Sequence, residues 1–259
     1  MASDDDRLAH ELAAEAGRRL LALRAAGGEP DDLRKAGDRT SHEFLTAELA
    51  RRRPDDVVLS EEGADNPARL TAGRVWIVDP LDGTREFGEA GRPDWAVHVA
   101  LWVRDAGEQG SLTAGAVALP AQDRVLSTVS PPPAPPAAHP AARPRIVVSR
   151  TRPAPFLPRM AELLGADLIP LGSAGAKVAA VLNAECDAYV HAGGQYEWDS
   201  AAPVAVARAA GLHASRIDGS GLFYNQPDLL MPDILVCRPV LAGPLLDAIQ
   251  SARRDGGHR

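Results

Sequence analysis

Six consecutive residues combine groups that can hold a metal ion with groups that can hold a phosphate. They are Asp79-Pro80-Leu81-Asp82-Gly83-Thr84, and they follow the apolar run Val75-Trp76-Ile77-Val78. Because proline favours a turn, both carboxylates and the Leu81 carbonyl can point to one place. Hard cations such as Mg²⁺ prefer an all-oxygen ligand set of this kind. Gly83-Thr84 is expected to open a short helix whose free N–H groups suit a phosphate oxygen. The hexad therefore predicts metal-assisted phosphoryl transfer.

Two other interpretations of this hexad are less favoured. An Asp-Gly pair alone would indicate a surface turn, but a full hexad after an apolar strand is more specific. Haloacid-dehalogenase-type phosphatases carry Asp-x-Asp-Gly-Thr on an early strand, with the first aspartate as a covalent nucleophile. Here two residues separate the aspartates, and the motif begins only at Asp79. The spacing favours activation of water over an aspartyl-phosphate intermediate.

The elements around the hexad indicate how a site could form. Val57-Val58-Leu59 is followed by Ser60-Glu61-Glu62, so a second predicted strand also ends in carboxylates. Two such strands predict a site at one rim of a sheet. Apolar spacing further predicts helices over 5–24, 40–53, 173–182, 199–210 and 241–253, and strands over 95–103, 112–119, 125–129, 145–148, 188–191, 212–216 and 234–237. The fold class is therefore α/β, with an α+β first half and an alternating α/β second half.

A proline-rich run separates these two halves. It begins at Ser130-Pro131-Pro132-Pro133 and continues to Pro144, and proline at this density cannot lie inside a sheet. We expect an N-terminal α+β domain over 1–129 that carries most metal ligands, a linker over 130–144, and a C-terminal α/β domain over 145–259 that carries Asp199 and the substrate contacts.

Composition limits the classes of partner. The chain has 259 residues, of which 45% are hydrophobic, so it can bury a full core. A net charge of −7 argues against a nucleic-acid binder, and no apolar run is long enough to suggest a membrane helix. The acidic start Ser3-Asp4-Asp5-Asp6 is unlike a signal peptide, and two cysteines do not make a disulfide scaffold. We therefore expect a cytoplasmic protein.

Three segments together resemble a known family. Glu61-Glu62, the hexad, and Trp198-Asp199-Ser200-Ala201-Ala202 are similar to the signatures of the inositol-monophosphatase-like, lithium-sensitive phosphatases, in the family's order. The resemblance covers essentially the whole chain. It implies a layered αβαβα sandwich of the sugar-phosphatase type, two or three Mg²⁺ ions per site, inhibition by Li⁺, and a homodimer as the common assembly.

The resemblance also implies roles for individual residues. Glu61, Asp79 and the Leu81 carbonyl correspond to the first metal's ligands, and Asp79, Asp82 and Asp199 to the second's. Asp38 corresponds to the aspartate that orients the attacking water together with Thr84, although Arg34-Lys35-Ala36-Gly37 replaces the family's upstream Pro-Val-Thr. Two simpler roles stay open: Asp199 could only cap its helix, and Glu61 could be a solvated acid after a strand.

Local sequence favours one branch of this family. Thr84-Arg85-Glu86-Phe87 resembles the CysQ-type branch, the 3′-phosphoadenosine 5′-phosphate (PAP) phosphatases. Ala192 stands where inositol monophosphatases have an acidic sugar contact. Ser173-Ala174-Gly175-Ala176-Lys177 resembles the segment that this branch places beside the nucleotide, which implies that Lys177 could pair with the 5′-phosphate. The substrate contacts so implied are Gly83, Thr84, Arg85, Ser173 and Lys177.

The expected activity is therefore hydrolysis of PAP to AMP and phosphate by two-metal activation of water, with PAPS as a related ligand. One alternative is a broader sugar phosphatase that acts on inositol 1-phosphate or fructose 1,6-bisphosphate. Another is a non-catalytic phospholigand-binding protein. His98 and His191 lie in apolar strands, and we expect them to be buried core residues and not ligands.

Overall fold

The first sheet carries the hexad. The computed structural model describes residues 3–105, 109–135 and 143–256. Within these residues the first sheet has the strand order β1-β2-β3-β4-β5, with β1 parallel to β2 and the other neighbours antiparallel. The strands are β1 (Val57–Ser60), β2 (Arg74–Asp82), β3 (Ala96–Val103), β4 (Ser111–Leu119) and β5 (Arg124–Ser127).

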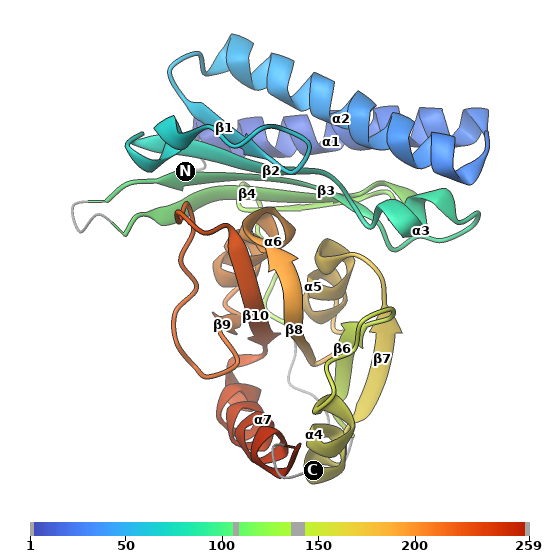
Figure 1. Cartoon of the computed structure of the whole chain (residues 1–259), viewed down its shortest axis with the longest axis vertical. Coiled ribbons are helices and arrows are strands. Elements are labelled where there is room, and N and C mark those ends of the chain that lie inside the picture. The colour runs from blue at the N-terminus through green and yellow to red at the C-terminus, as the bar shows by residue number, and fades with distance from the viewer. Residues whose placement is uncertain (1–2, 106–108, 136–142, 257–259) are drawn as a thin grey trace.

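The second sheet lies below the first (Figure 1) and has the order β7-β6-β8-β10-β9. Strand β6 pairs in parallel with both β7 and β8, whereas β10 is antiparallel to β8 and β9. The strands are β6 (Arg145–Ser149), β7 (Asp167–Leu171), β8 (Ala188–Tyr196), β9 (His213–Ser215) and β10 (Leu230–Cys237).

Helices form layers outside and between these sheets (Figure 1). The outer face of the first sheet is covered by α1 (Asp4–Ala26) and α2 (Pro30–Arg52), and α5 (Ala174–Leu182) and α6 (Glu197–Ala209) lie between the sheets. Helices α4 (Leu157–Leu164) and α7 (Ala242–Gly256) lie beyond the second sheet. The layered αβαβα arrangement predicted from the sequence is confirmed.

Apolar clusters hold these layers together. Leu12 and Leu45 of the outer helices share one cluster with Trp76 and Val99 of the first sheet. A second cluster joins the inner face of this sheet to α5, α6 and the second sheet, and a third joins the second sheet to α4 and α7. None of the helices in the described part of the chain is long and apolar enough to cross a membrane.

Some predicted boundaries were wrong. Helix α2 begins at Pro30 and not at Thr40, because Pro30 occupies the first helical turn, where a missing N–H costs nothing. Gly37 is interior to this helix: a Cβ there would lie 2.8 Å from Leu81 Cδ2 and from Phe87 Cε1. The glycine thus lets α2 approach the hexad closely. Helix α4 and strand β7 were not predicted, and residues 136–142 of the expected linker lie outside the described residues.

Candidate metal and phosphate site

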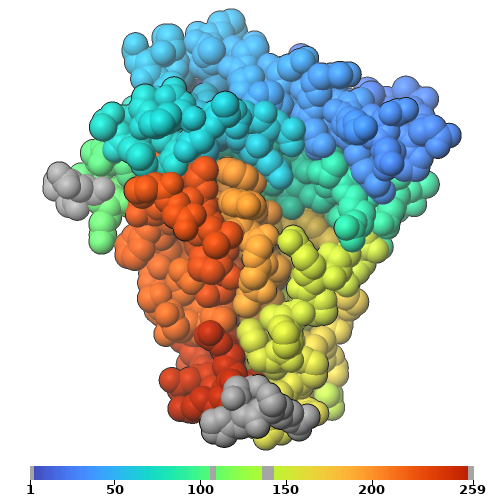
Figure 2. Space-filling view, in the orientation of Figure 1, coloured from blue at the N-terminus to red at the C-terminus, as the bar shows by residue number. Residues whose placement is uncertain are grey.

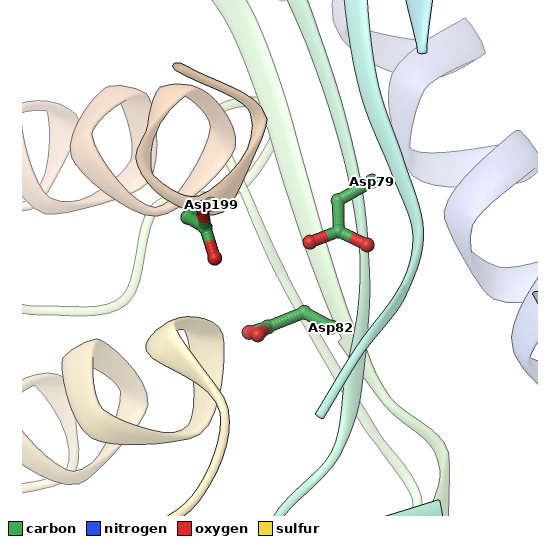
Figure 3. A group of neighbouring side chains, drawn as sticks. All are labelled: Asp79, Asp82 and Asp199. Carbon is green, nitrogen blue, oxygen red and sulfur yellow. The ribbon is translucent and has the colours of Figure 1, made fainter. Parts of the chain in front are cut away.

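Three aspartates from distant segments meet between the sheets. Asp79 and Asp82 end β2, and the pairing of β2 with β3 is irregular between them, so both carboxylates can face the same side. Asp199 lies in the first turn of α6 and approaches from the opposite side, as Figure 3 shows. One carboxylate oxygen from each aspartate lies within 4.8 Å of the others. The three residues form a ligand set suited to a hard cation.

The charges of this cluster repel one another. Burial, followed by the nearby Glu61, Asp82 and Asp199 carboxylates, raises the pKa of Asp79 well above its ordinary value. Burial and the charge of Asp82 raise the pKa of Asp199 to about 6. Buried like charges at this distance are unfavourable unless a cation compensates them. The electrostatics therefore fit a divalent metal ion.

Glu61 extends the cluster toward solvent. Parallel pairing of β1 and β2 places it next to Asp79, and the charge of Glu61 acts on the Asp79 carboxyl group. Burial of its carboxyl group and the charge of Asp199 raise the pKa of Glu61 to about 7, although much of the side chain is exposed. A solvated acid after a strand would not be expected to have this environment.

Removal of the metal should make the thermal stability of the protein depend on pH. Glu61, Asp79 and Asp199 have raised folded-state pKa values, so the folded state binds more protons than the unfolded state between their unfolded and folded pKa values. The resulting loss of folding stability is absent at pH values below the unfolded-state pKa values. It is complete at pH values above the folded-state pKa values. We expect the Tm in EDTA to fall as pH rises from about 4.5 to about 7.5, and Mg²⁺ to reverse most of this loss. A Tm in EDTA that rises over this range, measured by circular dichroism, would contradict the electrostatic account.

Asp82 is held more firmly than its neighbours. Its Oδ2 accepts hydrogen bonds from Ser173 Oγ at 2.6 Å and from the Gly175 amide at 2.7 Å, and His98 Nε2 lies 3.2 Å away. Burial alone would raise the pKa of Asp82, but the charges of His98 and Lys177 and the hydrogen bonds from His98 and Ser173 lower it overall. Asp82 is therefore the aspartate that is most readily ionised before a metal binds.

Thr84 and Asp38 form a hydrogen-bonded pair beside the cluster. Thr84 Oγ1 lies 3.2 Å from Asp38 Oδ1 and 3.0 Å from the Leu81 carbonyl oxygen, and both are acceptors. Burial, followed by the charge of Glu62, raises the pKa of Asp38 to about 6 even though the Thr84 hydrogen bond lowers it. Gly83 precedes Thr84 at φ +85°, where a Cβ would also lie 3.1 Å from Asp94 O. The turn thus needs glycine for two independent reasons.

A pocket of about 340 Å³ opens onto this cluster. Its lining includes all five residues expected to contact substrate: Gly83, Thr84, Arg85, Ser173 and Lys177. Arg85 is exposed, whereas Lys177 is buried and its ammonium group donates to the carbonyls of Gly172 and Ser173 at 3.1 and 2.7 Å. Lys177 therefore keeps one of its three N–H donors for other contacts.

Other lining residues had not been singled out from the sequence. Arg152 and Gln195 contribute to the pocket wall, and Arg152 belongs to no motif that could have indicated it. His191 is buried as expected, but it also lines the pocket. His98 is buried too, yet it contacts Asp82, and its Nδ1 lies 3.1 Å from the Trp198 carbonyl oxygen. The apolar strands around His98 and His191 predicted correctly that both side chains are buried. They did not indicate that His98 contacts Asp82 or that His191 lines the pocket.

Comparison with known proteins places the chain in a family. Residues 5–253 match the inositol monophosphatase family. The chain belongs to this family. It is 52% identical over 245 residues, covering 93% of this chain and 91% of its relative, to a Mycobacterium bovis protein named 3′-phosphoadenosine 5′-phosphate phosphatase. An Escherichia coli protein named 3′(2′),5′-bisphosphate nucleotidase CysQ is 30% identical over 201 residues, covering 73% of this chain and 78% of that protein.

A solved member of the family has the same fold. The crystal structure of CysQ from Bacteroides thetaiotaomicron aligns with a TM-score of 0.76 at 26% identity, covering 90% of this chain and 97% of that one. The family membership and layered fold predicted from Glu61-Glu62, the hexad and the Asp199 segment are thus confirmed.

Proposed function

We propose that this protein hydrolyses the 3′-phosphate of PAP to give AMP and phosphate, by two-metal activation of water. The observation that carries the proposal is that the cluster of Asp79, Asp82 and Asp199 lies beside the Thr84–Asp38 pair. Asp82, Thr84 and Asp199 line one pocket. The 52% identity to a protein named as a PAP phosphatase supports the choice of substrate. This combination favours catalysis over simple phospholigand binding, which would not require the water-orienting pair.

The carboxylates of Asp79, Asp82 and Asp199 would hold Mg²⁺, with Glu61 and the Leu81 carbonyl as further ligands. Mg²⁺ held there would polarise the phosphate, lower the pKa of the attacking water and stabilise the leaving oxygen. The buried, mutually repelling oxygen set fits such an ion. Li⁺ inhibition is part of the same proposal and follows from the family resemblance.

The Thr84–Asp38 pair would orient and deprotonate the water. As Thr84 Oγ1 accepts a proton from the water, it would pass its own proton to Asp38 Oδ1 along the existing hydrogen bond. Asp38 has a pKa of about 6, which suits a group that must be ionised and yet accept a proton near neutral pH. The 3′-oxygen would leave without a covalent enzyme intermediate.

The substrate would occupy the pocket beside this pair. The Gly83 and Thr84 amides would face the reacting phosphate, and Arg85, Ser173 and Lys177 would line its surroundings. Glu86, which also lines the pocket, is paired with Arg150 at 2.6 Å and offers little to a sugar ring. Ala192 carries no carboxylate where inositol monophosphatases have an acidic sugar contact. The pocket thus favours PAP over inositol 1-phosphate.

Product analysis tests this proposal. The purified protein is incubated with PAP in Mg²⁺ or in EDTA, and the nucleotides are separated by ion-exchange chromatography. We expect 5′-AMP and inorganic phosphate in equal amounts with Mg²⁺ and neither product in EDTA. Formation of adenosine 3′-phosphate, or turnover that continues in EDTA, would overturn the proposed reaction. PAP binding without any turnover in Mg²⁺ would support the non-catalytic alternative.

A further inference from the structure

The segment after β6 places Arg152 in the pocket wall. Strand β6 is parallel to both of its neighbours, and ligands in α/β folds gather at the carboxyl ends of such strands. The backbone amide of Arg152 donates to Ser149 Oγ at 3.1 Å, which turns the segment back on itself. Figure 2 shows this yellow-green segment reaching the N-terminal half beside the light-orange segment of β8 and α6. Ser149, Thr151 and Arg152 all line the pocket.

The guanidinium group of Arg152 has no acidic partner among the residues that the structure describes. Its neighbour Arg150 is different, because it is bound to Glu86 at 2.6 Å and to Glu89 at 3.1 Å. Lys177, another cation of the lining, already donates to two carbonyls. Arg152 therefore lines the pocket with a guanidinium group that no described acid neutralises, and its planar N–H donors suit bidentate phosphate recognition.

The surroundings of Arg152 fix its position on the wall. A Cβ on Gly194 would lie 2.9 Å from Arg152 Nη1, so the guanidinium group rests close above the backbone of β8. The positive charge of Arg152 also acts on the buried His191 in the same wall. The pKa of His191 is lowered to about 4, chiefly by burial, and the charge of Arg152 adds to this shift. His191 is consequently neutral near pH 7 and does not add a competing charge.

We propose that Arg152 binds a second phosphate of the substrate, the 5′-phosphate of PAP, while the 3′-phosphate lies at the carboxylate cluster. This inference rests on the proposed function for the identity of the substrate. Arg152 would then be the residue that makes the pocket prefer a nucleoside bisphosphate over a monophosphate. The carboxylates and Arg152 line the same pocket and have opposite charge, so they would hold the two ends of one ligand in a single orientation.

Kinetics of Arg152→Ala test the inference in the Mg²⁺-loaded enzyme. Since a hydrogen bond to a charged group contributes enough to change affinity about tenfold or more, we expect the KM for PAP to rise by about that factor with little change in kcat. The kcat/KM for adenosine 3′-phosphate, which lacks the 5′-phosphate, should stay unchanged.

Two further variants serve as controls. Arg152→Lys should recover part of the loss. Arg124→Ala, which removes the same charge from an exposed site on β5 outside the pocket, should match the wild type. An equal loss on both substrates would overturn the inference.

A binding measurement separates this inference from the proposed reaction. AMP and adenosine are titrated into the wild type and Arg152→Ala by calorimetry in EDTA, where no metal can hold a phosphate at the carboxylates. We expect the wild type to bind AMP more tightly than adenosine, and the variant to lose this difference. Equal binding of AMP and adenosine by the wild type, or an unchanged preference in the variant, would refute the role of Arg152. A wild type that prefers AMP but does not hydrolyse PAP would instead refute only the proposed reaction.

Discussion

Asp79→Asn is expected to abolish PAP hydrolysis, with kcat lower on the order of 10³-fold or more, because metal ions supply several kcal/mol of transition-state stabilisation. The charges of Glu61, Asp82 and Asp199 all act on the Asp79 carboxyl group. Asparagine is nearly isosteric and can still accept the Leu81 amide hydrogen bond, which is 3.0 Å long in the wild type. It removes the charge that would bind both metals. The measurement is steady-state phosphate release at saturating Mg²⁺.

The same variant should remain folded. Because it removes one of several repelling charges, its Tm in EDTA near neutral pH should equal or exceed that of the wild type. The added stability on Mg²⁺ binding should be lost. Asp247→Asn makes the same chemical change at an exposed position of α7 and serves as the control. Near-normal turnover by Asp79→Asn would refute the metal site, and a trapped aspartyl-phosphate on the wild type would refute direct attack by water.

Thr84→Val is expected to lower kcat by about 10²–10³-fold, in the range that a positioned proton-transfer group contributes. Valine preserves the shape of threonine but removes the hydroxyl that donates toward Asp38 and the Leu81 carbonyl. The KM for PAP should change much less than kcat, because the hydroxyl would act on the attacking water. Rates should be measured at saturating PAP and Mg²⁺.

Thr84→Ser supplies the matched control for this change. Serine keeps the hydroxyl, so most of kcat should be retained, and Asp38→Asn should resemble Thr84→Val if the two residues act as a pair. Additive losses in the double variant would indicate independent roles. A Thr84→Val enzyme with a kcat close to that of the wild type would remove this pair from the mechanism.

Much of the fold could be predicted because the spacing of apolar residues and the positions of turn residues indicated the same helices and strands. The strand that precedes Glu61 and the strand that carries Asp79 were found this way, and their parallel pairing brings the two residues to one edge. Helix α2 was predicted ten residues short, because its start was placed at Thr40, whereas the helix begins at Pro30. In the structure Gly37 packs against Leu81 and Phe87, a tertiary contact that helix propensity does not encode.

The sequence predicted those residues of the candidate site that belong to recognisable carboxylate motifs. It did not predict single residues that only the tertiary structure brings to the site. Asp38 lies beside Thr84 although its upstream sequence departs from the family pattern. Arg152 follows no motif, and only the turn at Ser149 together with the close approach to Gly194 brings it into the pocket. The bonding of the Lys177 ammonium group to two carbonyls was also unpredictable, because it depends on the backbone path before α5.

The most direct test of the central claim compares kcat/KM for PAP, inositol 1-phosphate and fructose 1,6-bisphosphate under identical Mg²⁺, with EDTA controls. We expect activity only with Mg²⁺, and a higher kcat/KM for PAP than for either sugar phosphate. Over inositol 1-phosphate the preference should be about tenfold or more, the contribution of one charge-assisted phosphate contact. A higher kcat/KM for either sugar phosphate would contradict the assignment of this family member as a PAP phosphatase.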